Sequence, residues 1–274
     1  MSIEVIKMKT VALYGCGAIG NVLAEYLDKE NFAELIGIFD LRQDAMKDLK
    51  SKLKKWDPIA VNSIEDLLDL NPDIVIEAAS PKSTIENAEK ILERTNLMLM
   101  CTGTLFKLYD TLLETAEITG HKVYAPSGAI AGIDAVKSAE IGGIEKVMIA
   151  TSKNPRSIEQ TSYLNEKEIY LSEITEPTVL FEGPAEQAVK YFPNNTNVSA
   201  TLSYAAKSQV IVKLVADPNI ETNQHEIFVK GEFGELYTRV RNVPSPNNPK
   251  TSYLAALSAA RTLKKIFENI EVGT

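Results

Sequence analysis

The sequence predicts an α/β protein with a doubly wound parallel sheet and a second α+β domain on a mixed or antiparallel sheet. Three observations lead to this fold class. Over the first 126 residues, short apolar runs alternate with segments of helical periodicity, the pattern of βαβ units. The apolar runs at 73–79 and 97–101 are nearly continuous, as in strands buried on both faces. Beyond Pro126, apolar and polar residues alternate more, which is typical of a sheet with one solvated face.

The elements of the first half are predicted from the spacing of their apolar residues. Residues 18–29 place apolar side chains at i, i+3, i+4, i+7 and i+8 from Ile19, which form one face of a helix. Residues 44–55 have an apolar face and five lysines on the remainder, which predicts a helix with a solvated lysine face. Ser63 followed by Asp66 is a partial capping box and opens a short helix. The predicted strands are 10–14, 35–39, 59–61, 73–79, 97–101 and 123–125, and the further helices are 83–94 and 105–119.

The second half predicts shorter strands with two helices between them. Small residues at 127–132 form a turn that leads into a helix, and residues 231–234 suit a hairpin. Three prolines make 244–249 a rigid connector. The helix predicted at 253–267 is expected to pack back against the first domain. The predicted strands are 147–151, 178–182, 209–216, 226–230 and 236–240, and the helices are 185–192 and 197–206.

The composition argues against several classes of protein. Lys plus Arg number 29 and Asp plus Glu number 37, a net charge of −8 without a basic run, so nucleic acid is not an expected partner. The longest uncharged stretch is too short and too rich in glycine to span a membrane, and the first ten residues do not form a signal peptide. The two cysteines provide neither a disulfide framework nor zinc spacing, so we expect no metal site. The expected location is the cytoplasm.

A glycine motif follows the first predicted strand. Residues 15–20 read GCGAIG, which matches G-x-G-x-x-G, and they open the first helix. Glycines in such a turn let the backbone approach a pyrophosphate at the positive end of the helix dipole. Asp40 lies 20 residues beyond Gly20, where an acidic side chain binds the hydroxyls of the adenine ribose. The pattern predicts a Rossmann-type domain, and its cofactor-binding residues are Gly15, Gly17, Ala18, Ile19, Gly20 and Asp40.

Ribose binding by Asp40 favours NAD as the cofactor. Arg42 lies two residues further on, where its side chain can approach a 2′-phosphate, so NADP stays possible. We therefore assign residues 1–126 plus 250–274 to a dinucleotide-binding domain and residues 127–249 to a domain for substrate binding and dimerisation.

Ligands of doubly wound sheets bind beyond the carboxyl ends of the strands. This rule selects the loops that follow the fourth, fifth and sixth predicted strands. The last of these is the small-residue turn at 127–132. Further cofactor-binding residues are predicted at Ala79, Ser80, Pro81, Thr102 and Gly103.

The same rule separates the two histidines. His121 precedes the sixth strand, at the amino end of the sheet, so a structural or solvent-exposed role is expected. His225 lies at the start of a strand in the second domain, and an ordinary histidine pKa of about 6.5 suits proton transfer, although a structural role is the alternative. Cys101 follows an apolar run without an activating base, so it is expected to be a buried thiol, and Cys16 is expected to pack.

Seven short segments occur together in this chain. They are GCGAIG (15–20), AASP (78–81), PSGAIAG (126–132), FPNNTNV (192–198), VADP (215–218), NQH (223–225) and PSPNNPKTS (244–252). In this combination and order, the chain resembles the L-aspartate dehydrogenase family from about Val11 to Leu263. The glycine motif alone is generic, and the specificity comes from the set of turns.

The resemblance implies oxidative deamination of L-aspartate with NAD or NADP, through iminoaspartate to oxaloacetate and ammonia, or the reverse amination. It also implies that the imine can feed NAD biosynthesis. In that family the histidine of the N-x-H segment is catalytic, which corresponds to His225 here. The resemblance further implies that Ala129 and Asn197 bind the cofactor and that the protein is a homodimer.

A dicarboxylate substrate requires cationic or amide donors. We expect Asn195, Lys250, Thr251 and Ser252 to supply them, together with Asn197. Whether Lys153, in the segment SKNP, reaches a substrate carboxylate is open at this point.

Two other functions remain in competition. One is a related two-domain dehydrogenase with an activity like that of homoserine dehydrogenases. The other is a sensor that binds NAD without catalysis, which would need the glycine motif and Asp40 but not His225. Turnover on a panel of amino acids separates the three.

Overall fold

The computed structural model describes residues 8–30, 32–193, 196–245, 248–270 and 272–273. The chain divides into two compact units. Unit 1 comprises Met1–Pro126 and Ala259–Glu271, and unit 2 comprises Ser127–Ser258 and Val272–Thr274. Helix α10 (Tyr253–Phe267) begins in unit 2 and ends in unit 1. In the described part of the chain, no helix is long and apolar enough to cross a membrane.

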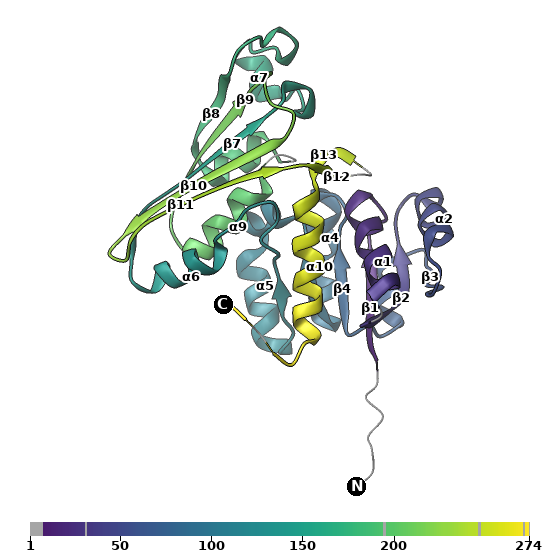
Figure 1. The fold of residues 1–274 in the computed structure, drawn as a ribbon. Coiled ribbons are helices and arrows are strands. Elements are labelled where there is room, and N and C mark those ends of the chain that lie inside the picture. Colours follow the sequence, from purple (N-terminus) through teal and green to yellow (C-terminus); the bar gives the residue numbers. More distant parts are fainter. Residues whose placement is uncertain (1–7, 31, 194–195, 246–247, 271, 274) are drawn as a thin grey trace. The chain divides into compact units, whose positions relative to one another are not determined.

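Unit 1 contains a six-stranded sheet in which every pairing is parallel (Figure 1). The strand order is β3-β2-β1-β4-β5-β6, the order of a doubly wound dinucleotide-binding sheet, which confirms the predicted fold class. The strands are β1 (Lys9–Tyr14), β2 (Ala33–Phe39), β3 (Ile59–Ala60), β4 (Ile74–Glu77), β5 (Asn96–Leu99) and β6 (Val123–Tyr124).

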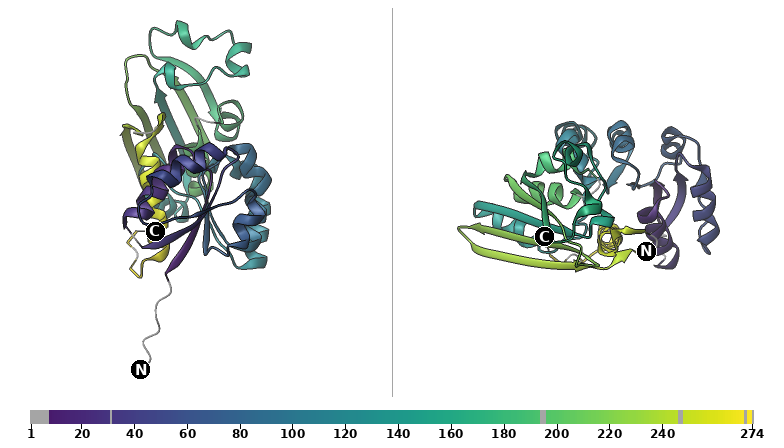
Figure 2. Two further views of the ribbon diagram at one scale, coloured as in Figure 1. Left: turned by 90° about the vertical axis from the view of Figure 1, so that its right-hand side faces the viewer. Right: turned by 90° about the horizontal axis from the view of Figure 1, so that it is seen from above.

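Helices cover both faces of this sheet, as the left view of Figure 2 shows for α1 and α10 on one side and α4 on the other. Leu23 and Leu27 of α1 share a buried core with Leu263 of α10, which confirms that the last helix packs against the first domain. Ser63 caps α3 by accepting from Asp66 N at 3.0 Å, as predicted. The helices of unit 1 are α1 (Ala18–Glu30), α2 (Gln43–Lys52), α3 (Ile64–Asp69), α4 (Pro81–Arg94), the 3-10 turn η1 (Thr102–Thr104) and α5 (Leu105–Thr119).

Unit 2 contains a five-stranded mixed sheet in the order β11-β10-β7-β9-β8. Only β7 and β9 are parallel, and the other neighbours are antiparallel, as the alternating sequence pattern predicts. The strands are β7 (Ile144–Lys153), β8 (Thr178–Pro184), β9 (Val210–Ala216), β10 (Asn223–Gly231) and β11 (Gly234–Asn242). The helices are α6 (Ile133–Ile141), α7 (Ser162–Glu166), α8 (Ala185–Tyr191) and α9 (Asn197–Ala206).

Alternate residues of the central strands are buried on one face of this sheet. Val147, Ile149 and Thr151 of β7 lie on that face, and α9 and α8 pack near it. The intervening residues are only partly buried. The burial alternation therefore gives unit 2 one covered face and one more open face.

Several strands are longer than predicted, among them β7 and β11, and three further differences concern the connections and the site. The predicted connector at 244–249 contains β12 (Pro244–Ser245), which pairs with β13 (Asn248–Ser252). The segment after β7 folds into η2 (Pro155–Ser157), α7 and η3 (Leu171–Glu173), for which no periodicity was visible. Strand β10 begins at Asn223, so His225 lies inside the strand, and its register with β7 defines the position of the side chain.

Candidate functional site

The glycine motif forms the turn between β1 and α1 in unit 1. Gly15 has φ of 102°, and a Cβ there would lie 2.4 Å from Ala78 O, so only glycine fits. A Cβ on Gly20 would lie 2.1 Å from Gly15 O, which makes Gly20 necessary for close packing of the helix on the turn. A Cβ on Gly17 would meet no atom within 4 Å. The open side of Gly17 fits the position at which a dinucleotide backbone approaches.

Asp40 follows β2 and is bound to the glycine turn. Its Oδ2 accepts from Cys16 N and its Oδ1 from Arg42 N, each at 2.8 Å. Arg42 Nε lies 3.7 Å from Asp40 Oδ1. These bonds hold an acidic and a basic side chain together at the end of β2, where the ribose is expected.

The loops after β4 and β5 contain the other predicted cofactor-binding residues of unit 1. Ser80 caps α4, because its hydroxyl accepts from Ser83 N, and Pro81 occupies the first helical turn. Thr102 and Gly103 are buried in η1, and Cys101 Sγ donates to Ala79 O at 3.4 Å. The two loops are thus in direct contact.

Glu77 is a buried carboxylate between these loops that the sequence analysis did not select. The side chain has no exposed surface, and it accepts from Ala79 N at 2.8 Å, Thr84 Oγ1 at 2.8 Å and Cys101 N at 3.0 Å. Burial raises the pKa of the carboxyl, and the hydrogen bonds from Cys101, Thr84 and Ala79 oppose that rise. Its signal in the sequence is an acidic residue inside a nearly continuous apolar run.

Both thiols are buried, as predicted. Burial, and then the charge of Asp40, raise the pKa of the Cys16 thiol to about 12. Burial and the charge of Glu77 raise the pKa of the Cys101 thiol as well. Neither sulfur is available as a thiolate nucleophile at neutral pH.

His121 lies at the amino end of the unit 1 sheet, as predicted. Its Nδ1 is 2.7 Å from the carbonyl oxygen of Leu92, at the end of α4. The carboxyl ends of the strands, where the glycine turn and Glu77 lie, are at the opposite edge. His121 therefore joins a helix to a strand and has no place in the cofactor loops.

His225 is buried on the covered face of the unit 2 sheet. Its Nδ1 lies 3.0 Å from the hydroxyl of Thr151, which is its register partner on β7. Burial, and then the charge of Lys153, lower the pKa of His225 to about 3, so the ring is neutral at physiological pH. When Nδ1 carries the proton it donates to Thr151, and Nε2 keeps a lone pair with which to accept a proton.

Strand register places more polar side chains on the same face. Lys153 lies two residues beyond Thr151 on β7, and Asn223 lies two residues before His225 on β10. Asn242 is the register partner of Asn223 on β11. We call these five residues, Thr151, Lys153, Asn223, His225 and Asn242, the polar cluster, and all five are buried.

The polar cluster offers several kinds of chemistry in one place. Burial lowers the pKa of Lys153 to about 8, so the side chain is a cation below that pH. Asn242 donates to Ala129 O at 2.9 Å, and its Oδ1 accepts from none of the described residues. A neutral base, a cation and an amide oxygen are the groups that an amino acid with an extra carboxylate would require.

For the remaining predicted site residues the structure describes fewer contacts. Ser252 Oγ accepts from Asn223 Nδ2 at 3.3 Å, which joins Ser252 to the polar cluster. Asn197 is the first residue of α9, and Thr251 is half-buried in β13. Asn195 and the side chain of Lys250 lie outside the described residues.

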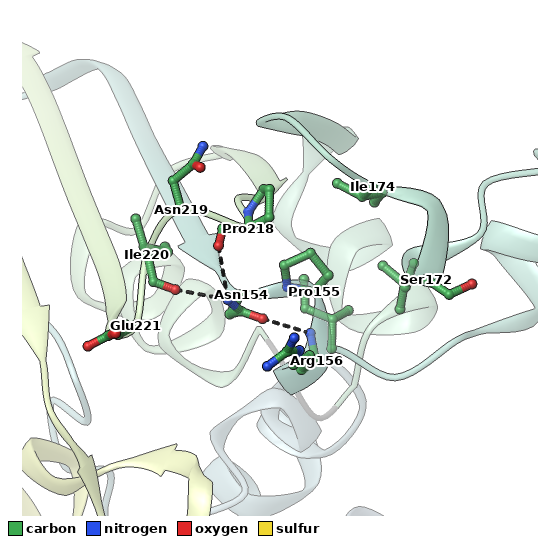
Figure 3. Close-up of a pocket in the computed structure, with 11 residues that line it drawn as sticks. Asn154, Pro155, Arg156, Ser172, Ile174, Pro218, Asn219, Ile220 and Glu221 are labelled. Carbon is green, nitrogen blue, oxygen red and sulfur yellow. Dashed lines mark hydrogen bonds between the residues drawn. The ribbon is translucent and has the colours of Figure 1, made fainter.

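A pocket of about 630 Å³ opens where β7 ends (Figure 3). Asn154 donates from Nδ2 to the carbonyl oxygens of Ile220 at 3.0 Å and Pro218 at 3.4 Å. Asp217 N donates to Lys153 O at 2.8 Å. These bonds attach the loop before β10 to the end of β7, and they fix where β10 begins. Among the described residues that line the pocket, none is a predicted site residue.

Comparison with known proteins finds a matching family model for each half of the chain. Residues 15–126 match the family model of the homoserine dehydrogenase NAD-binding domain, and residues 134–266 match that of the aspartate dehydrogenase C-terminal domain. The L-aspartate dehydrogenase of Methanococcoides burtonii is 42% identical over 97% of this chain and 100% of its own length. That of Nitrosopumilus maritimus is also 42% identical, with the same coverage of both chains.

Solved structures lead to the same family. The crystal structure of aspartate dehydrogenase from Thermotoga maritima superposes with a TM-score of 0.73 and 26% identity, over 97% of this chain and all of that one. A hyperthermophilic archaeal homoserine dehydrogenase, at 13% identity and a TM-score of 0.61, shares the fold. With full-length relatives above 40% identity and a matching carboxyl-terminal family model, this chain belongs to the L-aspartate dehydrogenase family.

Proposed function

We propose that this protein is an NAD(P)-dependent L-aspartate dehydrogenase. It removes the amino group of L-aspartate oxidatively, through iminoaspartate to oxaloacetate and ammonia, or catalyses the reverse amination. The observation that carries the proposal is the polar cluster, in which a neutral His225 and the cationic Lys153 share one buried sheet face. A chain of this family with these groups has both the base and the carboxylate-binding cation that the reaction requires.

The residues of unit 1 fit a nicotinamide dinucleotide. The open side of Gly17 accepts the pyrophosphate at the start of α1, and Asp40 accepts hydrogen bonds from the ribose. When bound, the dinucleotide supplies the hydride acceptor for Cα of the substrate. Ala79, Ser80, Pro81, Thr102, Gly103, Ala129 and Asn197 complete the proposed cofactor-binding set.

His225 has two proton transfers to perform. The substrate ammonium must lose a proton before the C–N bond becomes an imine, and the water that hydrolyses the imine must lose one as well. Nε2 of the neutral ring accepts the first proton, releases it to solvent and is then free to accept the second, while Thr151 holds Nδ1 and hence the orientation of the ring. The ring must be neutral to accept either proton, and burial keeps it neutral in the free protein. A strongly lowered pKa also weakens the ring as a base, so we expect the negative charge of the bound dicarboxylate to raise the pKa of His225 toward the working pH.

The substrate carboxylates need partners of opposite charge. Lys153 is the buried cation of the polar cluster, and we assign it to one carboxylate. Asn195, Lys250, Thr251 and Ser252 stay in the proposal as further ligands, and Ser252 is the one among them whose contact with the polar cluster is described. The amide oxygen of Asn242 is available to the substrate amino group.

The test is reduction of NAD by the purified protein with L-aspartate at alkaline pH. L-Homoserine, L-glutamate and D-aspartate are measured beside it, and NADP replaces NAD in a second series. Turnover restricted to L-aspartate, lost in His225→Ala with NADH binding retained, is the expected result. Tight NADH binding without turnover of aspartate in either direction would instead favour a sensor, and turnover of L-homoserine would favour the related dehydrogenase.

The assembly and location are further parts of the proposal. We infer a homodimer that uses the open face of the unit 2 sheet, where Met148, Ile211 and Phe228 are only partly buried. Light scattering should give twice the mass of 30.1 kDa, and charged substitutions on that face should give the monomer. A cytoplasmic location is proposed for an enzyme that uses a nicotinamide dinucleotide, and cell fractionation tests it.

A further inference from the structure

The side chain of Glu77, the last residue of β4, joins two loops of unit 1, and a third loop lies against one of them. Its Oε1 accepts from Ala79 N, in the β4–α4 loop, at 2.8 Å. Its Oε2 accepts from Cys101 N and Met100 N, in the β5–η1 loop, at 3.0 and 3.1 Å. One carboxylate therefore binds the backbone of two different loops, one with each oxygen.

The third loop is the glycine turn. It lies so close to the β4–α4 loop that a Cβ on Gly15 would come within 2.7 Å of Ala79 N, the same amide that Glu77 binds. Ala78 N also donates to Tyr14 O at 2.7 Å, immediately before the glycine turn. The position of the Ala78–Ala79 peptide thus depends on Glu77 on one side and on Gly15 on the other.

A carboxylate in this place is costly in isolation. The side chain has no exposed surface, and an ionised group loses its hydration on burial. An apolar residue would complete the buried strand at lower cost, but it would leave the amides of Ala79 and Cys101 without an acceptor. The amide of Met100 would keep its bond to the backbone carbonyl oxygen of Glu77. The second donor to Oε1, the buried hydroxyl of Thr84, adds a bond to the first turn of α4.

We propose that Glu77 is a positioning residue of the cofactor site, whose carboxylate holds the β4–α4 and β5–η1 loops at the separation that the dinucleotide requires. The inference rests on the proposed placement of the cofactor at Ala79–Pro81 and Thr102–Gly103. Glu77 is enclosed by protein, so it acts through the loops and does not touch the cofactor.

Glu77→Gln is the main test because it changes chemistry and not size. The amide carries one acceptor oxygen and one NH2 group, so in either orientation the NH2 faces a backbone N–H of one loop. We expect the dissociation constant for NADH, measured by fluorescence titration, to rise about tenfold or more, the range of one hydrogen bond to a charged group. The KM for NAD should rise in parallel, and the KM for L-aspartate should stay within about twofold of the wild-type value.

Two isosteric threonine variants separate positioning from stability. Thr84→Val removes the hydroxyl whose proton is shared between Glu77 Oε1 and Ser80 O, both of which belong to the β4–α4 connection. Thr95→Val removes the bond from Thr95 Oγ1 to Pro72 O, at the opposite end of the strands of the same sheet. Both threonines are buried, so the two variants should lose similar thermal stability. We expect Thr84→Val to weaken NADH binding about threefold and Thr95→Val to leave it unchanged. If Glu77→Gln does not fold, this pair carries the test.

Amide hydrogen exchange provides a readout independent of the cofactor. In Glu77→Gln, the amide of Ala79 or that of Cys101 should exchange faster, with the other strand amides unchanged. NADH binding by Glu77→Gln equal to wild type, or weakening by Thr95→Val equal to that by Thr84→Val, would overturn the inference. Wild-type protein that binds NADH but does not turn over aspartate would overturn the proposed function and leave the result on Glu77 standing.

Discussion

At the scale of single residues, the charge state of His225 is determined by burial. An unfolded chain protonates this histidine below a pH of about 6.5, and the folded protein resists protonation until about pH 3. The neutral ring therefore contributes stability that is fully present above about pH 6.5 and is lost as the pH falls toward 3. The same burial that keeps the ring neutral makes the fold sensitive to acid.

The free energy of unfolding of the wild type should therefore fall more steeply with acidification than that of His225→Gln. The difference approaches about 1.4 kcal/mol per pH unit for a single group. Urea denaturation at pH 7.5, 6.0 and 5.0 measures it. Parallel pH profiles for the two proteins would mean that the ring is not held neutral.

Lys153 provides a second residue-scale prediction, in the alkaline range. Its pKa of about 8 means that the proposed carboxylate-binding cation is lost as the pH rises above that value. The kcat/KM for L-aspartate should decline above about pH 8. In Lys153→Met, kcat/KM should be low at every pH and should show no decline in this range. Steady-state kinetics from pH 6.5 to 10 test this. NADH affinity should be unaffected, because Lys153 is assigned to the substrate and not to the cofactor. If kcat/KM of Lys153→Met declined above pH 8 as in the wild type, the decline would have to come from another titrating group.

The site itself was only partly predictable at this scale. The glycine turn, Asp40 and His225 carry local signals, because each is defined by neighbours in the sequence. Thr151 and Asn242 carry none, because their pairing with His225 and Asn223 depends on the register of strands far apart in the chain. Glu77 was missed because an acidic residue at a strand end has no partner visible in the sequence.

At the scale of elements, the start of α1 combines two glycines with opposite requirements. Gly20 has no room for a Cβ, since Gly15 O lies 2.1 Å from the position it would take. A Cβ on Gly17 would point into open space, with no protein atom within 4 Å. The fold requires glycine at position 20, and the proposed ligand requires glycine at position 17. This difference separates structure from function within one turn.

Gly20→Ala should lower the thermal midpoint and abolish NADH binding, because the turn must move to admit the methyl group. Gly17→Ala should keep the wild-type midpoint, within about 0.5 kcal/mol of stability, and lose NADH affinity about tenfold or more. Differential scanning calorimetry and fluorescence titration measure the two effects. Wild-type affinity in Gly17→Ala would place the dinucleotide away from this turn.

Periodicity predicted the longer elements well. Helices α5 and α10 begin and end at the predicted residues, because Gly120 terminates the first and an apolar face defines the second. The pairing of β12 with β13 was not predicted, since a proline-rich segment forms a ladder only when its partner is present. The turns after β7 lack an apolar repeat and depend on tertiary contacts.

At the scale of the whole molecule, the chain leaves unit 1 at Pro126 and returns to it within α10. Ala259, Ala260 and Leu263 are core residues of unit 1, although the first residues of the same helix belong to unit 2. The stability of unit 1 therefore depends on a segment that follows residues 127–258 of unit 2 in the sequence.

Leu263→Ala should destabilise unit 1 by about 2–5 kcal/mol, the range for a fully buried leucine. Leu257→Ala, on the same helix at 41% exposure, should be nearly neutral. Urea unfolding followed by the fluorescence of Trp56, which lies in unit 1, reports the difference. Equal effects of the two substitutions would show that α10 does not complete the core.

The late return of α10 has a consequence during protein synthesis. The ribosome has made every strand of the parallel sheet by residue 126, but one covering helix of that sheet does not yet exist. At about 5–20 residues per second, the missing helix follows roughly 7–30 s later. During that interval the apolar face that Leu263 will cover is exposed in the nascent chain, where a chaperone can bind it.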